Sequence, residues 1–232
     1  MSILERQTLR SFALFERLGD QEIDALAAHA SLRRVDAGQA VFVQGAPADE
    51  FFVLASGKLK VTQLTADGQQ VVIRFIAPGE LFGIARALRR PDYPGTATAV
   101  VYSAAVVWPM AFWDAFLEGN PALAIGAMQA VGQRLQESHT RLREMATQEV
   151  EQRVAHAVLR LAEQAGTPEA DGIRIDFPLS KQDIAEMTGT TLHTVSRILS
   201  AWQTRGLVRT GRKKLLIRDR EAIAELASTP RR

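Results

Sequence analysis

The residues best suited to chemistry lie in one cationic stretch near the C-terminal end of the chain. From Arg197 to Arg218 the sequence holds seven basic residues and no acidic one. Ammonium and guanidinium groups bind phosphate, and a guanidinium can also pair with two acceptors on the edge of a guanine. The stretch therefore favours a nucleic-acid-binding face. By charge alone, a solvated basic surface is the alternative.

Two short helices are predicted to position this stretch. Ser180-Lys181-Gln182-Asp183 forms a capping box at the start of the first helix. A turn at Thr188-Gly189-Thr190 leads into a second helix capped by Thr191. Residues 208–217 then predict a two-stranded wing with basic residues at its tip. The predicted buried side of the second helix comprises Val195, Ile198, Leu199 and Trp202.

A helix, a short glycine-containing turn and a helix followed by a basic wing is the pattern of a DNA-reading motif, and a plain helical hairpin is the alternative. Arg197 suits a guanine, and Leu192 suits a thymine methyl group. The expected base-reading residues are Leu192, His193, Ser196 and Arg197. The expected contacts to DNA phosphates are Ser180, Lys181, Thr191, Thr194, Arg212, Lys213 and Lys214.

A long helix precedes this region and carries an apolar stripe with spacings of three and four residues. Charged residues flank the stripe, which favours the seam of a coiled-coil dimer over a helix packed only on its own domain. The stripe comprises Met128, Val131, Leu135, Ser138, Leu142 and Met145.

The first half of the chain has a different period. Residues 3–30 are predicted to be two short helices broken at Gly19-Asp20, and from Leu32 to about Val107 apolar residues alternate between turns rich in Gly, Pro and Asp. That pattern predicts an antiparallel barrel or sandwich. A helix is predicted over 149–165 and a loop over 166–172.

Composition narrows the class of protein. The chain has no cysteine, so disulfides, thiolate metal ligands and cysteine nucleophiles are excluded. It has no Gly-x-Ser-x-Gly motif, no Walker loop and no His/Asp cluster at metal-ligand spacing, so we expect neither an enzyme nor a metal site. No apolar run reaches the ~20 residues of a membrane span, and no signal peptide is recognised. We therefore expect a soluble cytoplasmic protein without a membrane partner.

Two parts of the chain resemble the CRP/FNR superfamily of transcription regulators, and they follow each other in the same order as in that family. Residues 37–58 look like the shared β-roll sequence of the family, and residues 179–185 and 194–199 look like its helix-turn-helix. The resemblance implies an α+β fold with an N-terminal antiparallel β-roll of the cyclic-nucleotide-binding type, a dimerisation helix and a C-terminal winged helix-turn-helix. The expected boundaries are 1–118, 119–147 and 148–232.

The same resemblance implies a homodimer that binds double-stranded DNA at a two-fold palindromic site, with RNA polymerase as a further partner. Cyclic-AMP receptors of the family carry Gly-Glu and Arg-Ser where this chain has Gly83-Ile84 and Pro94-Gly95. The missing Arg would pair with the cyclic phosphate and the missing Glu with a ribose hydroxyl. Cyclic AMP is therefore not expected as the effector. The absence of cysteine excludes the iron–sulfur cluster of oxygen-sensing members.

Residues 93–99 and 188–197 look like the branch that regulates denitrification and nitric-oxide responses. That resemblance implies a response to nitric oxide or nitrogen-oxide status. Haem is compatible with the branch, and His139 is the candidate ligand. A different metabolite, no ligand at all, a ligand-binding regulatory module and a DNA-bending protein are the alternatives. The expected effector pocket comprises Gly83, Ile84, Arg86, Tyr93, Pro94 and Thr96.

Overall fold

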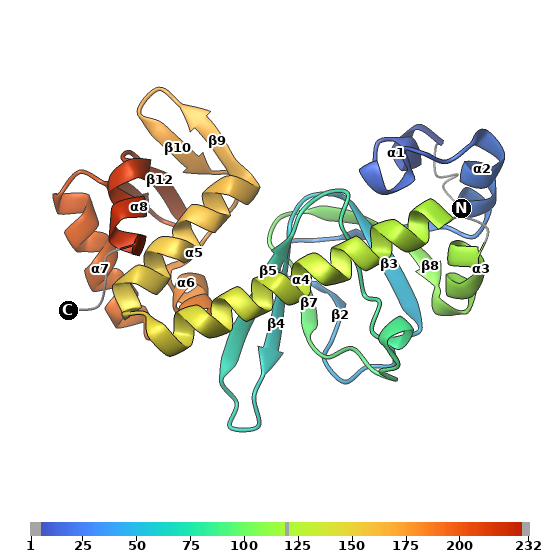
Figure 1. The fold of residues 1–232 in the computed structure, drawn as a ribbon, viewed down its shortest axis with the longest axis horizontal. Coiled ribbons are helices and arrows are strands. Elements are labelled where there is room, and N and C mark those ends of the chain that lie inside the picture. The colour runs from blue at the N-terminus through green and yellow to red at the C-terminus, as the bar shows by residue number, and fades with distance from the viewer. Residues whose placement is uncertain (1–5, 119–120, 229–232) are drawn as a thin grey trace. The chain divides into compact units, whose positions relative to one another are not determined.

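The computed structural model describes residues 6–118 and 121–228 (Figure 1). The chain divides into two compact units. One holds the chain up to Gly68 with Ile73–Gln136, and the other holds Gln69–Val72 with the chain from Glu137 onward. The division falls inside a long helix, α4 (Pro121–Thr147). The expected boundaries at 118 and 147 stay a prediction, and residues 119–120 lie outside the described residues.

Short helices begin the first unit, as predicted. They are α1 (Arg6–Arg10), η1 (Ala13–Phe15) and α2 (Asp20–Ala28). The N-cap of α2 is Gly19, whose N–H donates to the Glu22 carboxylate at 2.6 Å. Leu9, Phe15 and Ile23 are fully buried, so these helices close one side of the first hydrophobic core.

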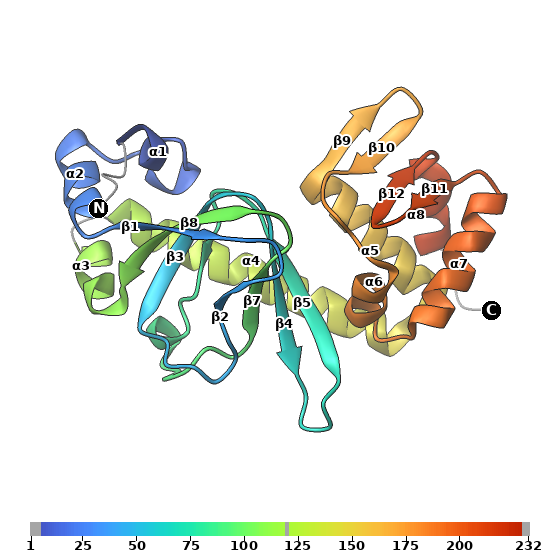
Figure 2. The ribbon, with the colours of Figure 1, turned by 180° about the vertical axis from the view of Figure 1, so that it is seen from behind.

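The roll consists of two four-stranded sheets, in the orders β1-β8-β3-β6 and β2-β7-β4-β5 (Figure 2). This confirms the antiparallel β-rich domain expected from the sequence. Residues 100–102 form a bend within the stretch predicted to be β-rich, because the chain passes there from β7 in one sheet to β8 in the other. The strands are β1 (Ser31–Val35), β2 (Ala40–Phe42), β3 (Glu50–Ser56), β4 (Leu59–Leu64), β5 (Gln70–Ile76), β6 (Leu81–Phe82), β7 (Thr96–Ala99) and β8 (Ser103–Pro109).

Strand β3 separates two apolar cores because neighbouring side chains on a strand point to opposite faces. Phe51 stacks on Trp108 with ring centroids 5.5 Å apart, in the core that also holds Leu123 of α4. Phe52 stacks on Phe82 at 5.0 Å, in the core inside the roll. The connections η2 (Arg86–Leu88), η3 (Met110–Phe112) and α3 (Trp113–Glu118) complete this unit.

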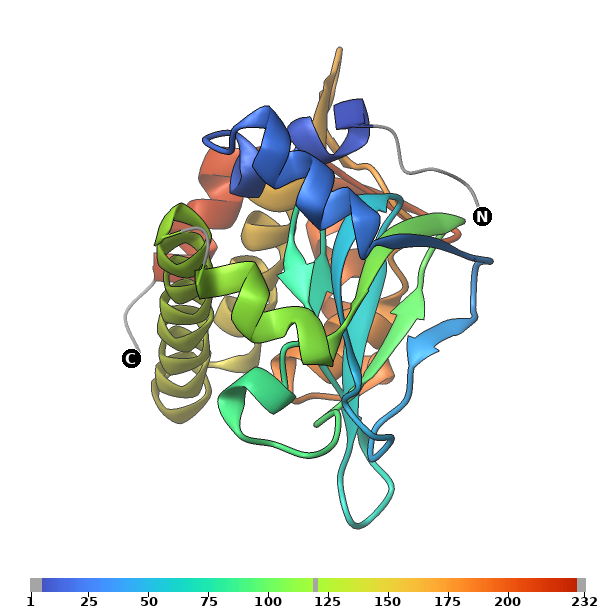
Figure 3. The ribbon, with the colours of Figure 1, turned by 90° about the vertical axis from the view of Figure 1, so that its right-hand side faces the viewer.

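Helix α4 has 27 residues, so it is about 40 Å long at 1.5 Å per residue. Figure 3 shows its ribbon continuing without a break. Leu123 and Ala127 are buried in the first core, whereas most residues of the predicted stripe are exposed. None of the helices in the described residues combines the length and apolarity that a membrane span requires.

The second unit is a winged helix domain. Its sheet has the order β11-β12-β10-β9, so the predicted loop over 166–172 is wrong. That segment forms a hairpin whose β10 pairs with β12, through Ile173 opposite Ile217. The turn residues within 166–172 suggested a loop, but pairing of β10 with the distant strand β12 fixes an extended backbone there. The elements are α5 (Val150–Ala165), β9 (Gly166–Glu169), β10 (Gly172–Ile175), α6 (Lys181–Thr188), α7 (Leu192–Thr204), β11 (Val208–Gly211), β12 (Lys214–Ile217) and α8 (Arg220–Ser228).

Candidate nucleic-acid interface and effector site

The two helices of the predicted motif begin and end on the expected signals. The Ser180 hydroxyl accepts from the Asp183 N–H at 3.0 Å, and the Asp183 carboxylate accepts from the Ser180 N–H at 2.9 Å. This reciprocal pair is the capping box. Gly189 ends α6 in the left-handed region at φ 61°, where a side chain would be strained and would also collide with Met145. Thr191 then caps α7 by accepting from the Thr194 N–H at 3.1 Å.

Helix α7 divides into a buried side and an exposed side. The predicted inner residues Val195, Ile198, Leu199 and Trp202 are buried. Trp202 is fixed further because its Nε1 donates to Glu151 Oε1 of α5 at 2.7 Å. Burying side chains of this size stabilises by roughly 1.5–3 kcal/mol each, so the orientation of α7 on its domain is strongly determined.

The predicted base-reading residues share the opposite side of α7. Leu192, His193 and Arg197 are exposed and Ser196 is half-buried. Their spacing of one, four and five residues places them on one helical face across the first two turns. Lys181 of α6 reaches this face, because its Nζ donates to Ser196 Oγ at 3.1 Å.

The wing brings further cations to the same domain. Arg212 and Lys213 form the turn between β11 and β12, and with Lys214 they are exposed. Lys213 has φ 55°, which is unusual for a residue with a Cβ. Its carbonyl accepts from the Leu179 N–H at 3.2 Å, which holds the turn beside the start of α6. A cleft of about 250 Å³ lies between them, lined by Ser180, Lys181, Arg212, Lys213 and Lys214 among others.

A basic residue that the sequence pattern did not single out joins the end of α4 to the helix-turn-helix. Arg153 of α5 donates from Nε to the Thr188 carbonyl at 3.0 Å and from Nη1 to the Gln148 carbonyl at 2.9 Å. Thr188 is the last residue of α6, so the guanidinium caps a helix C-terminus, where a cation is favoured. A second contact joins α4 to α5: Glu144 is buried and pairs with Arg160 at 2.5 Å.

The stripe on α4 is mostly exposed in a single chain. The exposed fractions are 66% for Met128, 56% for Leu135, 68% for Leu142 and 52% for Met145. Val131 is half-buried against the first core, and Ser138 is exposed. Exposing four large apolar side chains on one helix to water is unfavourable. An exposed apolar surface of this kind is typical of one that pairs with another chain.

The expected effector residues do not all face one space. Ile84 and Tyr93 are buried, and Gly83 has φ 73°, where a side chain would collide with Phe52. Arg86 instead points outward and pairs with Asp49 at 2.8 Å, with 60% of its side chain exposed. Pro94 and Thr96 are half-buried, and the Pro94 carbonyl accepts from the Gln63 side chain at 2.7 Å.

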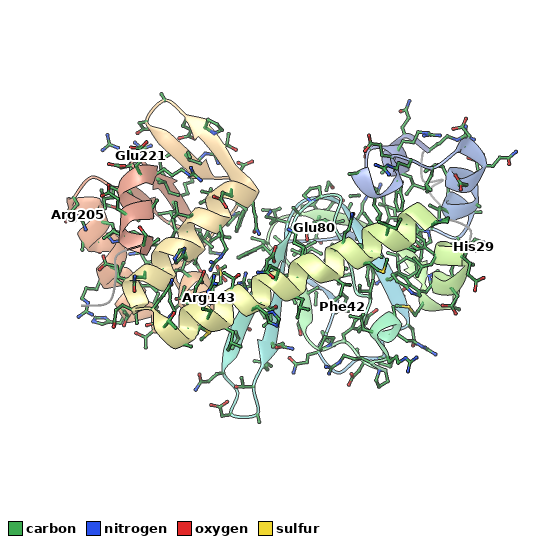
Figure 4. All side chains as sticks on the ribbon, viewed as in Figure 1. His29, Phe42, Glu80, Arg143, Arg205 and Glu221 are labelled. Atoms are coloured by element: carbon green, nitrogen blue, oxygen red, sulfur yellow. The ribbon has the colours of Figure 1, made fainter. Side chains whose placement is uncertain are left out.

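Tyr93 fills part of the roll interior. Its ring stacks on Phe42 with centroids 3.9 Å apart, and its hydroxyl donates to the Glu50 carbonyl at 2.7 Å. Figure 4 places Phe42 in the roll. Burial raises the pKa of the Tyr93 hydroxyl to about 12. The group is therefore neutral at physiological pH and acts as a fixed brace between β3 and the segment before β7.

The histidines do not gather into a metal site. His139 is exposed on α4, and His29 stacks on Phe112 at 4.4 Å. Within residues 6–118 and 121–228 there is no group of three or more His, Cys, Asp or Glu side chains placed to hold a metal ion.

Comparisons with known proteins match both units. Residues 152–226 match the Crp-like helix-turn-helix domain, and residues 32–120 match the cyclic nucleotide-binding domain. A CRP-like cAMP-activated global transcriptional regulator of Mycobacterium tuberculosis is 27% identical over 190 residues, which cover 82% of this chain and 85% of that protein. The nitrogen fixation regulation protein FixK of Azorhizobium caulinodans is 28% identical over 190 residues, covering 81% of this chain and 75% of that protein.

The fold is also known from experiment. The structure of FixK2 from Bradyrhizobium japonicum aligns with a TM-score of 0.76 at 20% identity, covering 87% of this chain and 99% of that chain. This likeness confirms the combination of β-roll, long helix and winged helix-turn-helix.

Proposed function

Because this chain is a DNA-binding transcription regulator of the CRP/FNR family, we propose that it acts as a homodimer on a two-fold palindromic site in double-stranded DNA. The exposed face of α7 carries the proposal: Leu192, His193, Ser196 and Arg197 lie together at the start of a helix whose other side is buried. A helix of that kind enters the major groove by its first turns. The wing cations would bind phosphates on either side.

Pairing through the α4 stripe supports the homodimer. The four side chains are 52–68% exposed, so their burial would contribute roughly 1–2 kcal/mol each, before the cost of association is subtracted. Two copies related by a two-fold axis would present two α7 helices to two half-sites, which is why the site should be palindromic. RNA polymerase is the further partner that we propose, since regulators of this family act on transcription.

Replacement of Arg197 tests base reading. The preferred site should first be selected from random DNA with the wild-type protein, and binding then measured by fluorescence anisotropy. Arg197→Ala should weaken binding to that site by about 1–3 kcal/mol and relax one base position. Arg205→Ala is the matched control, because Arg205 is also exposed but lies after the last turn of α7 (Figure 4). Equal losses on selected and random DNA would contradict the role of Arg197.

For the signal, we propose nitric oxide or nitrogen-oxide status. Support comes from the resemblance of residues 93–99 to that branch and from a relative named as a regulator of nitrogen fixation. Gly83-Ile84 and Pro94-Gly95 stand where cyclic-AMP receptors have their nucleotide contacts, which argues against that nucleotide. A different metabolite, or action without ligand, is the alternative, supported by the filled roll interior around Phe42 and Tyr93.

Haem does not fit the described residues of one chain, because His139 is exposed and aromatic rings occupy the roll interior. The proposal therefore uses no haem. DNA binding should be titrated anaerobically with and without a nitric-oxide donor, while the absorption spectrum is recorded with added haem. A change in affinity without a Soret band supports a haem-free response. Unchanged affinity would refute the nitrogen-oxide proposal and favour the alternative.

A further inference from the structure

The side chains of Lys181 and Ser196 form one hydrogen-bonded unit on the proposed DNA-reading face. Lys181 is the first residue of α6, and its Nζ donates to Ser196 Oγ of α7 at 3.1 Å. Both side chains are half-buried. From the sequence, Lys181 was expected only to contact a DNA phosphate. The structure instead brings its ammonium to a residue expected to read a base.

The donor and acceptor roles in this pair are fixed by chemistry. An ammonium group has three donors and no acceptor, whereas a hydroxyl has one donor and two acceptor lone pairs. Ser196 Oγ must therefore accept from Lys181 Nζ, which occupies one lone pair and leaves the hydroxyl proton free to donate elsewhere. The adjacent positive charge also disfavours the approach of another donor and favours the approach of an acceptor.

Bases differ in what they offer to such a group. In the major groove guanine presents the acceptors N7 and O6, and thymine presents the acceptor O4. Adenine presents the acceptor N7 beside its N6 amino donor. Cytosine presents the N4 amino group, which is a donor. A serine hydroxyl by itself can pair with a donor or with an acceptor on a base. A serine hydroxyl that already accepts from a lysine ammonium discriminates against cytosine.

We propose that Lys181 is a positioning residue for base recognition: its ammonium makes Ser196 a hydrogen-bond donor, so that the base facing Ser196 must present an acceptor. This inference rests on the proposed function, because it requires α7 to lie in the major groove. The inference goes beyond the proposed function because it predicts a chemical preference at one position of the half-site. It also attributes that preference to a residue outside α7.

The test measures base preference rather than overall affinity. Each position of the selected half-site is changed to all four bases, in both half-sites, and binding is measured for wild type, Ser196→Ala, Lys181→Met and Lys181→Arg. Ser196→Ala identifies the position that Ser196 faces. There the wild type should bind cytosine roughly fivefold more weakly per half-site than the best acceptor base, which is the scale of one net hydrogen bond. Lys181→Met should lose most of that discrimination, and Lys181→Arg should keep it because arginine also only donates.

Lys214→Met is the matched control, since it removes an exposed lysine of the wing and should weaken binding to every sequence alike. Thermal unfolding of each variant checks that the domain is intact, and loss of the discrimination in Lys181→Arg would also contradict the role assigned to the cation. If Ser196→Ala changes preference at no position, base reading by Ser196 and this inference both fail. If Ser196→Ala changes one position and Lys181→Met leaves the cytosine discrimination there intact, this inference alone is wrong.

Discussion

Lys213 in the turn of the wing allows a charge to be removed without damage to the fold. Its φ of 55° lies in the left-handed region, which costs an L-residue with a Cβ roughly 1–2 kcal/mol. Glycine adopts this conformation freely but loses about 0.5–1 kcal/mol more in chain entropy on folding. Lys213→Gly should therefore leave the protein between about 0 and 1.5 kcal/mol more stable. Urea denaturation measures this difference.

The same substitution should weaken DNA binding through charge alone. Each phosphate contact contributes about 0.9 to the slope of log affinity against log salt concentration. A homodimer with two wings would lose two contacts, so the slope should become shallower by roughly 1.8. Between 50 and 200 mM salt, the advantage of the wild type over the variant should then shrink roughly twelvefold. Fluorescence anisotropy on selected and random DNA should give the same change in slope.

Two comparison variants separate charge from backbone. Lys213→Asn is also neutral and tolerates the left-handed region, so it should match the glycine variant in slope. Arg17→Gln removes an exposed cation of the N-terminal unit and should leave the slope unchanged. A loss of stability in Lys213→Gly would show that the turn conformation was misjudged. An affinity loss that does not vary with salt would show that Lys213 does not contact phosphate.

Three further predictions concern dimerisation, pH and the end of α4. Leu135→Glu should be monomeric in sedimentation velocity and lose tight DNA binding. Gln136→Glu, at the neighbouring exposed position, should remain dimeric. A dimeric Leu135→Glu would show that the dimer interface does not use this stripe. The pKa of Tyr93 is raised by burial from 10.0 to about 12, so its contribution to stability is complete below pH 10 and lost as pH rises through 12. The free energy of unfolding should therefore fall by roughly 2–3 kcal/mol between pH 10 and 12. In urea denaturation Tyr93→Phe should show a shallower fall over this pH range. An identical fall in both proteins would contradict the raised pKa of Tyr93. Arg153→Gln should lower the free energy of unfolding by about 1–3 kcal/mol because two backbone carbonyls lose a charged donor, while Arg209→Gln, which breaks only an exposed pair with Asp171, should change it by less than about 1 kcal/mol.

The predictable parts of the interface are those encoded within a few residues. Ser180 and Asp183 are three positions apart and cap α6 with each other. Gly189 permits the left-handed turn that ends α6, and α7 has one apolar face. These features depend on local backbone geometry and on helical periodicity, so the sequence alone predicts both helices and which side of α7 is exposed.

The unpredicted parts depend on packing between distant segments. Arg153 contacts the carbonyl of Thr188, 35 residues later, and nothing in the spacing of either residue indicates that pair. Strand β10 pairs with β9 in a local hairpin and also with β12, which lies about 40 residues later in the chain. The effector residues were placed by resemblance to a pocket, but Arg86 points outward. Arg86 pairs there with Asp49, 37 residues earlier in the chain, which a local sequence pattern does not report.

The contacts at the end of α4 limit how a signal can reach the reading helix. Residues 146–149 join α4 to α5 and lie on the only covalent path between the long helix and the winged helix domain among the described residues. Glu144, just before this segment, is 5% exposed and pairs with Arg160, whose side chain is 26% exposed. Leaving a buried charge without its partner costs about 3–5 kcal/mol. Coupling between an effector site and a binding site is typically about 1–3 kcal/mol. An effector of ordinary strength therefore cannot open this pair, so the last turns of α4 must move together with α5. A signal would then act by changing how the α4 stripes of two chains meet, which Leu135 and Leu142 would report through altered pairing, and not by bending the chain at Gln148.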